Sequence, residues 1–172
     1  MTSNDFRNLI KTHLATVAIG PSALRNQGAP GIIEIARQFL SSLDFSPYNT
    51  SNPQHFATQL DVDTNRLIHA WPLKGRSWGA ARKALNLFLR DAIYNHWFHN
   101  DLSKAYDFLE IPLDSYVATN LKTEYSGQLP RWRQIKTLTP DESILFQNAA
   151  LELAKLRGIN RVDLDIVLWR RP

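Results

Sequence analysis

Cysteine is missing from this sequence of 172 residues, and long apolar runs are missing as well. A chain without cysteine can form no disulfide, no thiolate nucleophile and no cysteine-ligated zinc site. No apolar run approaches the roughly 18 residues that a membrane-spanning helix needs. The first residues also lack the basic start and apolar core of a signal peptide, so we expect a cytoplasmic protein without a membrane partner.

Side chains that bind metal ions are sparse too. Of the five histidines, His96 and His99 stand three positions apart, and His69 lies elsewhere in the chain. A structural or catalytic zinc site needs three or four protein ligands, which this pattern does not supply. We therefore expect neither a metal ion nor another cofactor.

The basic excess is confined to one part of the chain. The net charge of +4 arises in residues 74–172, where fifteen Lys and Arg face eleven Asp and Glu. A basic face attracts a polyanion such as DNA, because its cations replace the counterions of the phosphates. A charge of this size is also compatible with a role in solubility alone.

Apolar residues recur at helical spacing through most of the sequence, which predicts an all-α fold. Helix starts are marked by Pro53 after Asn52 and by the capping box from Thr139 to Glu142. Residues 161–170 alternate like a strand, but a lone strand would have no partner, so we predict a helix there. The whole chain, 1–172, reads as one domain that could divide into two lobes. We expect helices at about residues 3–17 (capped by Ser3 or Asn4), 31–43, 53–60, from Asp61 or Asp63 to 70, 78–99, 102–109, 115–121 and 139–157.

Two short motifs could carry chemistry. Gly79-Ala80-Ala81-Arg82-Lys83-Ala84-Leu85-Asn86 opens the long predicted helix, and Ile111-Pro112-Leu113-Asp114-Ser115-Tyr116-Val117 opens a later one, with Asp114 standing 31 residues after Lys83. A lysine amine can form a Schiff base, and a carboxylate can stabilise developing positive charge. The alternatives are that Lys83 belongs to a solvated basic face and that Asp114 is a plain helix cap.

Both motifs resemble those of the helix-hairpin-helix DNA glycosylases, the HhH-GPD superfamily. The family hairpin reads G-V-G-R-K-T-A-N, and its second motif reads I-P-V-D-T-H-V. The resemblance covers about residues 71–121, implies a helix-hairpin-helix at about 63–99, and places Ala81 where the second hairpin glycine is usual. In lysine–aspartate spacing the chain is most similar to the archaeal 8-oxoguanine DNA glycosylase branch. By this resemblance Lys83 is the nucleophile and Asp114 the essential carboxylate.

The resemblance implies a monomeric DNA glycosylase, with or without AP lyase activity, that acts on double-stranded DNA with a flipped base. It would excise a damaged or modified base, in base-excision repair or in defence against phage with modified DNA. Trp78 and Trp132 are candidates for the base pocket. The candidate DNA contacts are Lys74, Arg76, Ser77, the backbone amides of Gly79, Ala80 and Ala81, and the cations Arg131 and Arg133.

Two other functions are compatible with the same residues. The first is a non-catalytic helix-hairpin-helix DNA-binding module, in which Lys83 only touches phosphate. The second is a helical protein–protein interaction domain in which the motif is a coincidence. The alternative for Arg131-Trp132-Arg133 is a core tryptophan between two solvated arginines. The glycosylase hypothesis requires that Lys83 and Asp114 meet in space.

Overall fold

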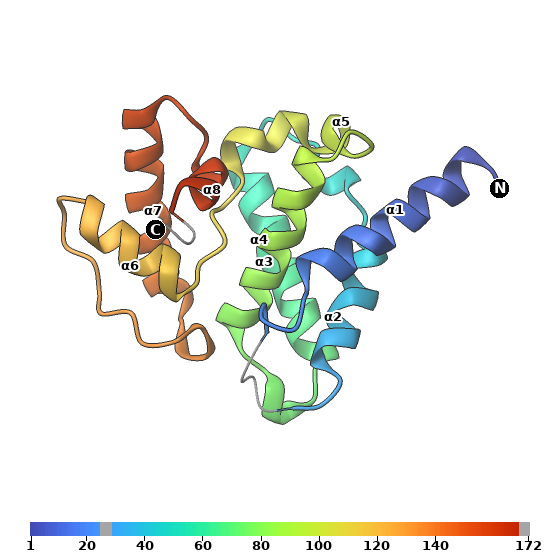
Figure 1. The fold of residues 1–172 in the computed structure, drawn as a ribbon, viewed down its shortest axis with the longest axis horizontal. Helices are drawn as coiled ribbons and strands as arrows, with labels where there is room; N and C mark the ends of the chain where they lie inside the picture. The colour runs from blue at the N-terminus through green and yellow to red at the C-terminus, as the bar shows by residue number, and fades with distance from the viewer. Residues whose placement is uncertain (25–28, 169–172) are drawn as a thin grey trace.

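The computed structural model describes residues 1–24 and 29–168, and every regular element in them is helical (Figure 1). The all-α prediction is therefore confirmed for the described residues, which contain no strand. None of their helices is both long and apolar enough to cross a membrane. The α-helices are α1 (Ser3–Ala18), α2 (Ile32–Ser41), α3 (Pro53–Ala70), α4 (Trp78–Tyr94), α5 (His99–Leu102), α6 (Ser115–Glu124), α7 (Pro140–Arg157) and α8 (Leu164–Leu168). The 3₁₀ helices are η1 (Ser46–Tyr48), η2 (Leu73–Gly75), η3 (Ser103–Phe108), η4 (Ile135–Thr137) and η5 (Arg161–Asp163).

Local capping chemistry accounts for several helix ends. The side chain of Asn52 caps α3, with Pro53 in the first helical position. Thr139 and Glu142 form the predicted capping box of α7, and Gly158 ends this helix with a φ of 66°. The cap of α1 was predicted wrongly, because Thr2 rather than Ser3 or Asn4 accepts the hydrogen bond from Asp5.

Two predicted helix boundaries are wrong. Residues 53–70 form one helix, so Asp61 and Asp63 lie inside α3 instead of capping a second helix. Asp63 is buried and its carboxylate accepts a hydrogen bond from the hydroxyl of Tyr48 at 2.8 Å, which replaces the capping contact. Helix α4 ends at Tyr94 rather than at His99, because Asn95 takes an extended conformation.

The C-terminal prediction is confirmed where the structure describes it. Residues 161–168 are helical as η5 followed by α8, and positions 169–170 lie outside the described residues.

Buried apolar side chains gather in two clusters. The first is built by α1 to α5 with η1 and η3 and also includes Val162. The second is built by α6, α7, α8 and the segments that lead into α6 and α7. Helix α4 runs through the middle of the molecule, packing on α1 and α3 on one side, with η4 and α7 on the other (Figure 1). The two clusters therefore meet along α4, the helix that carries Lys83.

Candidate active site

The structure brings Lys83 and Asp114 together. The ammonium nitrogen Nζ of Lys83 lies 3.7 Å from Oδ2 of Asp114, which is an ion pair slightly longer than a hydrogen bond. The two side chains are 11% and 21% exposed, so they are screened from bulk water and still open to a ligand. The pairing on which the glycosylase hypothesis depends is thus present.

Asp114 uses its two carboxylate oxygens for different purposes. Oδ1 accepts hydrogen bonds from the backbone N–H groups of Tyr116, at 2.9 Å, and Val117, at 3.0 Å, and so caps α6. Oδ2 faces Lys83. These two hydrogen bonds hold the carboxylate in place at the helix start. The capping role and the pairing role therefore hold together.

The ion pair lies in the wall of a cleft of about 490 Å³, within the size range of small-molecule sites. This wall is formed by α4, by α8, by the start of α6 with the residues just before it, and by the end of α1 with the turn after it. The cleft therefore lies between segments of both apolar clusters. Its lining residues are Val17, Ala18, Gly20, Ser22, Ala23, Lys83, Leu87, Arg90, Asp91, Pro112, Asp114, Ser115, Tyr116 and Asp165.

Three more charged groups stand in the cleft wall. Arg90 pairs with Asp165 of α8, and its Nε donates to Oδ1 of Asp91 at 2.9 Å. The pKa of the Asp91 carboxyl is raised, because the effect of burial is larger than the opposing effect of the Arg90 charge. Burial also raises the pKa of Asp165, against the charge of Arg90, and the nearby charge of Asp114 raises it further. Buried carboxyls with raised pKa values beside a cleft are typical of functional sites.

The predicted hairpin amides are placed differently from the expectation. Gly79, Ala80 and Ala81 form the buried first turn of α4. A Cβ atom on Gly79 would lie 2.3 Å from the carbonyl oxygen of Ile135, so η4 packs directly on this turn. The hydroxyl of Ser77 accepts from the N–H of Ala80 and donates to a carbonyl of η4. These residues pack the protein interior, and the structure does not present Gly79, Ala80 and Ala81 to a phosphate.

The segments before α4 and before α7, which meet at this turn, carry exposed cations. These are Lys74, Arg76, Arg131, Arg133 and Lys136. Within the described part of the chain none of these five cations takes part in an ion pair. The bond from Ser77 to the carbonyl of Lys136 links the two segments that carry them. We call these five residues the basic surface.

The two tryptophans proposed for the base pocket lie outside the cleft. Trp78 is partly buried against the second apolar cluster, with the guanidinium of Arg82 over its ring at 5.1 Å. Trp132 packs edge-on against Phe146, at 5.5 Å between ring centroids. The base-pocket prediction is therefore not supported for either residue, because both rings are engaged in packing.

Sequence reasoning missed the aromatic residue that does line the cleft. Tyr116 is 56% exposed and follows Asp114 by two positions. Its place inside the motif, two positions after Asp114, was the available signal. Sequence reasoning also missed three charged cleft residues, Arg90, Asp91 and Asp165. Asp165 of α8 meets Arg90 and Asp91 of α4 only in the tertiary fold, so the sequence does not show that the three share a cleft.

Comparison of the chain with protein-family models, with curated proteins and with solved structures gives no match. Among the described residues, no three acidic or histidine side chains are grouped so that they could hold a metal ion.

Proposed function

We propose that this protein is a DNA glycosylase with AP lyase activity, in which Lys83 is the nucleophile and Asp114 the assisting carboxylate. The observation that carries the proposal is the ion pair between Lys83 Nζ and Asp114 Oδ2, at 3.7 Å, in the wall of a 490 Å³ cleft. A nucleobase must leave the DNA stack before its glycosidic bond can be attacked, and the cleft provides room for it. Its substrate is a damaged or modified base, met in repair or in phage DNA.

The chemistry follows from the two groups. Lys83 attacks C1′ of the deoxyribose as a neutral amine, so its ammonium must first lose a proton to water in the cleft. The bond from C1′ to the base breaks, and the base leaves with the electron pair and takes up a proton. Opening of the sugar ring then gives a Schiff base on Lys83. The ionised Asp114 stabilises the positive charge that develops on the sugar.

The basic surface supports DNA as the partner. None of its cations has an acidic partner within the described residues, so Lys74, Arg131, Arg133 and Lys136 are available to phosphates. Arg76 is partly engaged, because its guanidinium donates to the carbonyls of Trp71, at 3.1 Å, and His69, at 3.3 Å. Gly79 lies beneath Ile135 of η4, the helix that also carries Lys136, and Lys83 follows Gly79 by four residues, or about 6 Å along the axis of α4. A DNA backbone on the basic surface would thus pass close to the helix turn that carries Lys83.

The alternative of a non-catalytic helix-hairpin-helix module is less well supported. Such a module binds phosphate through hairpin amides, but here Gly79, Ala80 and Ala81 are buried and η4 packs on Gly79. It also leaves unexplained why Lys83 and Asp114 pair beside a cleft instead of facing solvent.

The deciding experiment is borohydride trapping of the protein on DNA that contains an abasic site. The native protein should form a covalent adduct, and Lys83→Gln should form none, because no Schiff base can arise without the amine. The matched control is Lys155→Gln, which changes an exposed lysine of α7. This variant should form the covalent adduct as efficiently as the native protein. The lyase part of the proposal fails if Lys83→Gln is trapped as efficiently as the control. Base release is measured separately, on DNA carrying oxidised or phage-type modified bases.

A further inference from the structure

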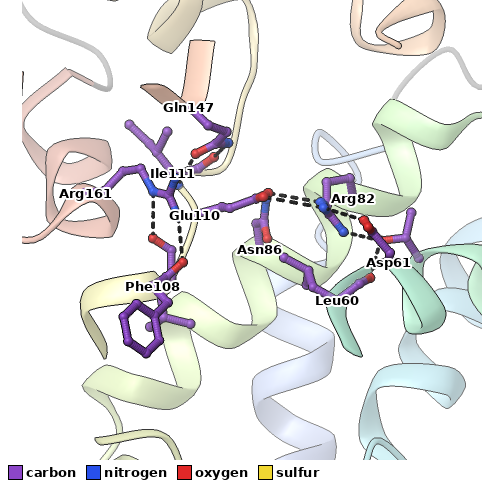
Figure 2. A network of polar contacts seen from close by, with 11 residues as sticks. Leu60, Asp61, Arg82, Asn86, Phe108, Glu110, Ile111, Gln147 and Arg161 are labelled. Carbon is purple, nitrogen blue, oxygen red and sulfur yellow. Dashed lines mark hydrogen bonds and ion pairs between the residues drawn. The ribbon is translucent and has the colours of Figure 1, made fainter. Parts of the chain in front are cut away.

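The connection between η3 and α6 passes from one apolar cluster to the other just before Asp114. Leu109 belongs to the first cluster and Ile111 to the second. Arg161 holds the beginning of this connection, because its guanidinium donates to the carbonyls of Phe108, at 2.6 Å, and Leu109, at 3.1 Å (Figure 2). The place of Asp114 therefore depends on how the connection is fixed between the two clusters.

Glu110 ties the connection to α4. Its carboxylate accepts hydrogen bonds from Nε of Arg82, at 3.0 Å, and from Nδ2 of Asn86, at 2.9 Å (Figure 2). Arg82 is itself held by α3, since it donates to Asp61 at 2.7 Å and to Thr64 at 2.9 Å. Arg82 and Asn86 flank Lys83 in the sequence of α4. The connection to Asp114 is thus anchored on the helix turns that carry the lysine.

Gln147 of α7 ties the next residue of the connection. Its side-chain oxygen accepts from the N–H of Ile111 at 3.1 Å, and its amide nitrogen donates to the carbonyl of Ile111 at 2.8 Å (Figure 2). Both bonds are buried, so their loss would leave backbone groups without partners and force the connection to move. Only Pro112 and Leu113, which are also buried, separate Ile111 from Asp114.

We propose that Glu110 and Gln147 are positioning residues for Asp114. The first sets the connection against α4 and the second sets it against α7, so that together they place Oδ2 of Asp114 opposite Nζ of Lys83. Neither side chain lines the cleft, and both act through Asp114. Small displacements of a reacting group are costly, since a misplacement of about 1 Å can slow a reaction by roughly 100-fold. The catalytic part of this inference rests on the proposed glycosylase function.

The catalytic test uses Gln147→Met, which keeps the side-chain length but removes both bonds to Ile111. Asn148→Met, an exposed neighbour on the same helix, is the control. Under single-turnover conditions Gln147→Met should release base roughly 10- to 100-fold more slowly. Its affinity for DNA and the rate of the control should stay native.

A double-mutant cycle separates positioning from a general structural defect. If Gln147 acts through Asp114, the rate loss caused by Gln147→Met should largely disappear when Asp114 is already Asn. An equal loss in both backgrounds would overturn the inference. A second pair is available if Gln147→Met does not fold: Glu110→Ala should be slow, and Glu110→Gln, which keeps acceptor and size, should recover part of the rate.

A measurement without activity tests the same inference independently of the proposed function. Amide hydrogen exchange at Tyr116 and Val117 reports on their bonds to Oδ1 of Asp114. Gln147→Met should speed exchange at both amides relative to Asn148→Met. Native exchange there would overturn the positioning role even if the enzyme is active. If the native protein releases no base and traps no DNA, the proposed function fails, and the exchange data still decide whether Gln147 places Asp114.

Discussion

The first turn of α4 and the turn that carries Lys83 belong to one helix but have opposite surroundings. Gly79 in the first turn is covered by η4, whereas Lys83, one turn further on, reaches a cleft and a carboxylate. The family resemblance implies that the first turn binds DNA phosphate and that Lys83 is the nucleophile. The structure buries the first turn, here called the packing turn, and places Lys83 of the second, the lysine turn, beside the cleft. The two turns should therefore respond differently to substitution.

The largest effect is expected at Asp114, the carboxylate that pairs with Lys83 of the lysine turn. Asp114→Asn keeps an oxygen that can cap α6 but removes the charge opposite Lys83. Base release should fall by about 10²- to 10³-fold, the usual cost of losing a charge-stabilising group. The free energy of unfolding should change by less than about 1 kcal/mol, the scale of a cap change. Single-turnover kinetics and urea denaturation measure the two quantities, and a folded variant with native activity would contradict the role of Asp114.

The packing turn should show the reverse pattern, a loss of stability. Gly79→Ala places a Cβ atom 2.3 Å from the carbonyl oxygen of Ile135 and 2.7 Å from Cβ of Leu138, so η4 must shift. Urea denaturation should show a loss of about 1–3 kcal/mol, typical of overpacking. Gly20→Ala is the control, because its nearest neighbour would be 3.8 Å away. Equal stability of the two variants would mean that η4 does not press on α4.

The basic surface around the packing turn should contribute to DNA affinity rather than to chemistry. The double variant Arg131→Gln with Arg133→Gln should weaken binding to DNA of any sequence. It should also reduce the salt dependence of log K by roughly one unit for each lost phosphate contact. Lys155→Gln, at the other end of α7, is the control. Fluorescence anisotropy over a salt series measures both quantities, and an unchanged salt dependence would place the DNA elsewhere.

The smallest effect is expected from the cleft carboxyl of Asp91. Burial raises its pKa above the ordinary value of 3.8, so the folded state binds the proton more strongly than the unfolded chain does. The stronger proton binding stabilises the folded state. This stabilisation is complete below pH 3.8 and is lost as the pH rises through the raised pKa. Asp91→Asn should therefore raise Tm at pH 7, and the increase in Tm should be smaller near pH 4.

The control for this prediction is Asp107→Asn, which changes an exposed carboxyl outside the cleft. Thermal denaturation at the two pH values provides the comparison. A lower Tm of Asp91→Asn at pH 7 would show that the contact with Arg90 outweighs the cost of burying the charge.

The sequence was sufficient where local chemistry decides the structure. The proline after Asn52 and the capping box from Thr139 to Glu142 predicted two helix starts correctly, because their hydrogen bonds lie within three residues. The same reasoning from neighbouring residues was wrong at Asp63, which was predicted to cap a helix and lies inside α3. In the fold its carboxylate is satisfied inside α3 by Tyr48, a residue that local reasoning does not bring near.

The sequence by itself determined the all-α class and singled out Lys83 and Asp114 as candidates. Only the tertiary structure decided that they pair across 31 positions, that Gly79 lies under Ile135, and that the cleft is completed by Asp165 rather than by Trp78 or Trp132. Periodicity specifies which face of a helix is apolar, but not which distant segment covers it. Contacts between distant segments depend on how the two apolar clusters pack against α4, and that packing is a property of the whole chain.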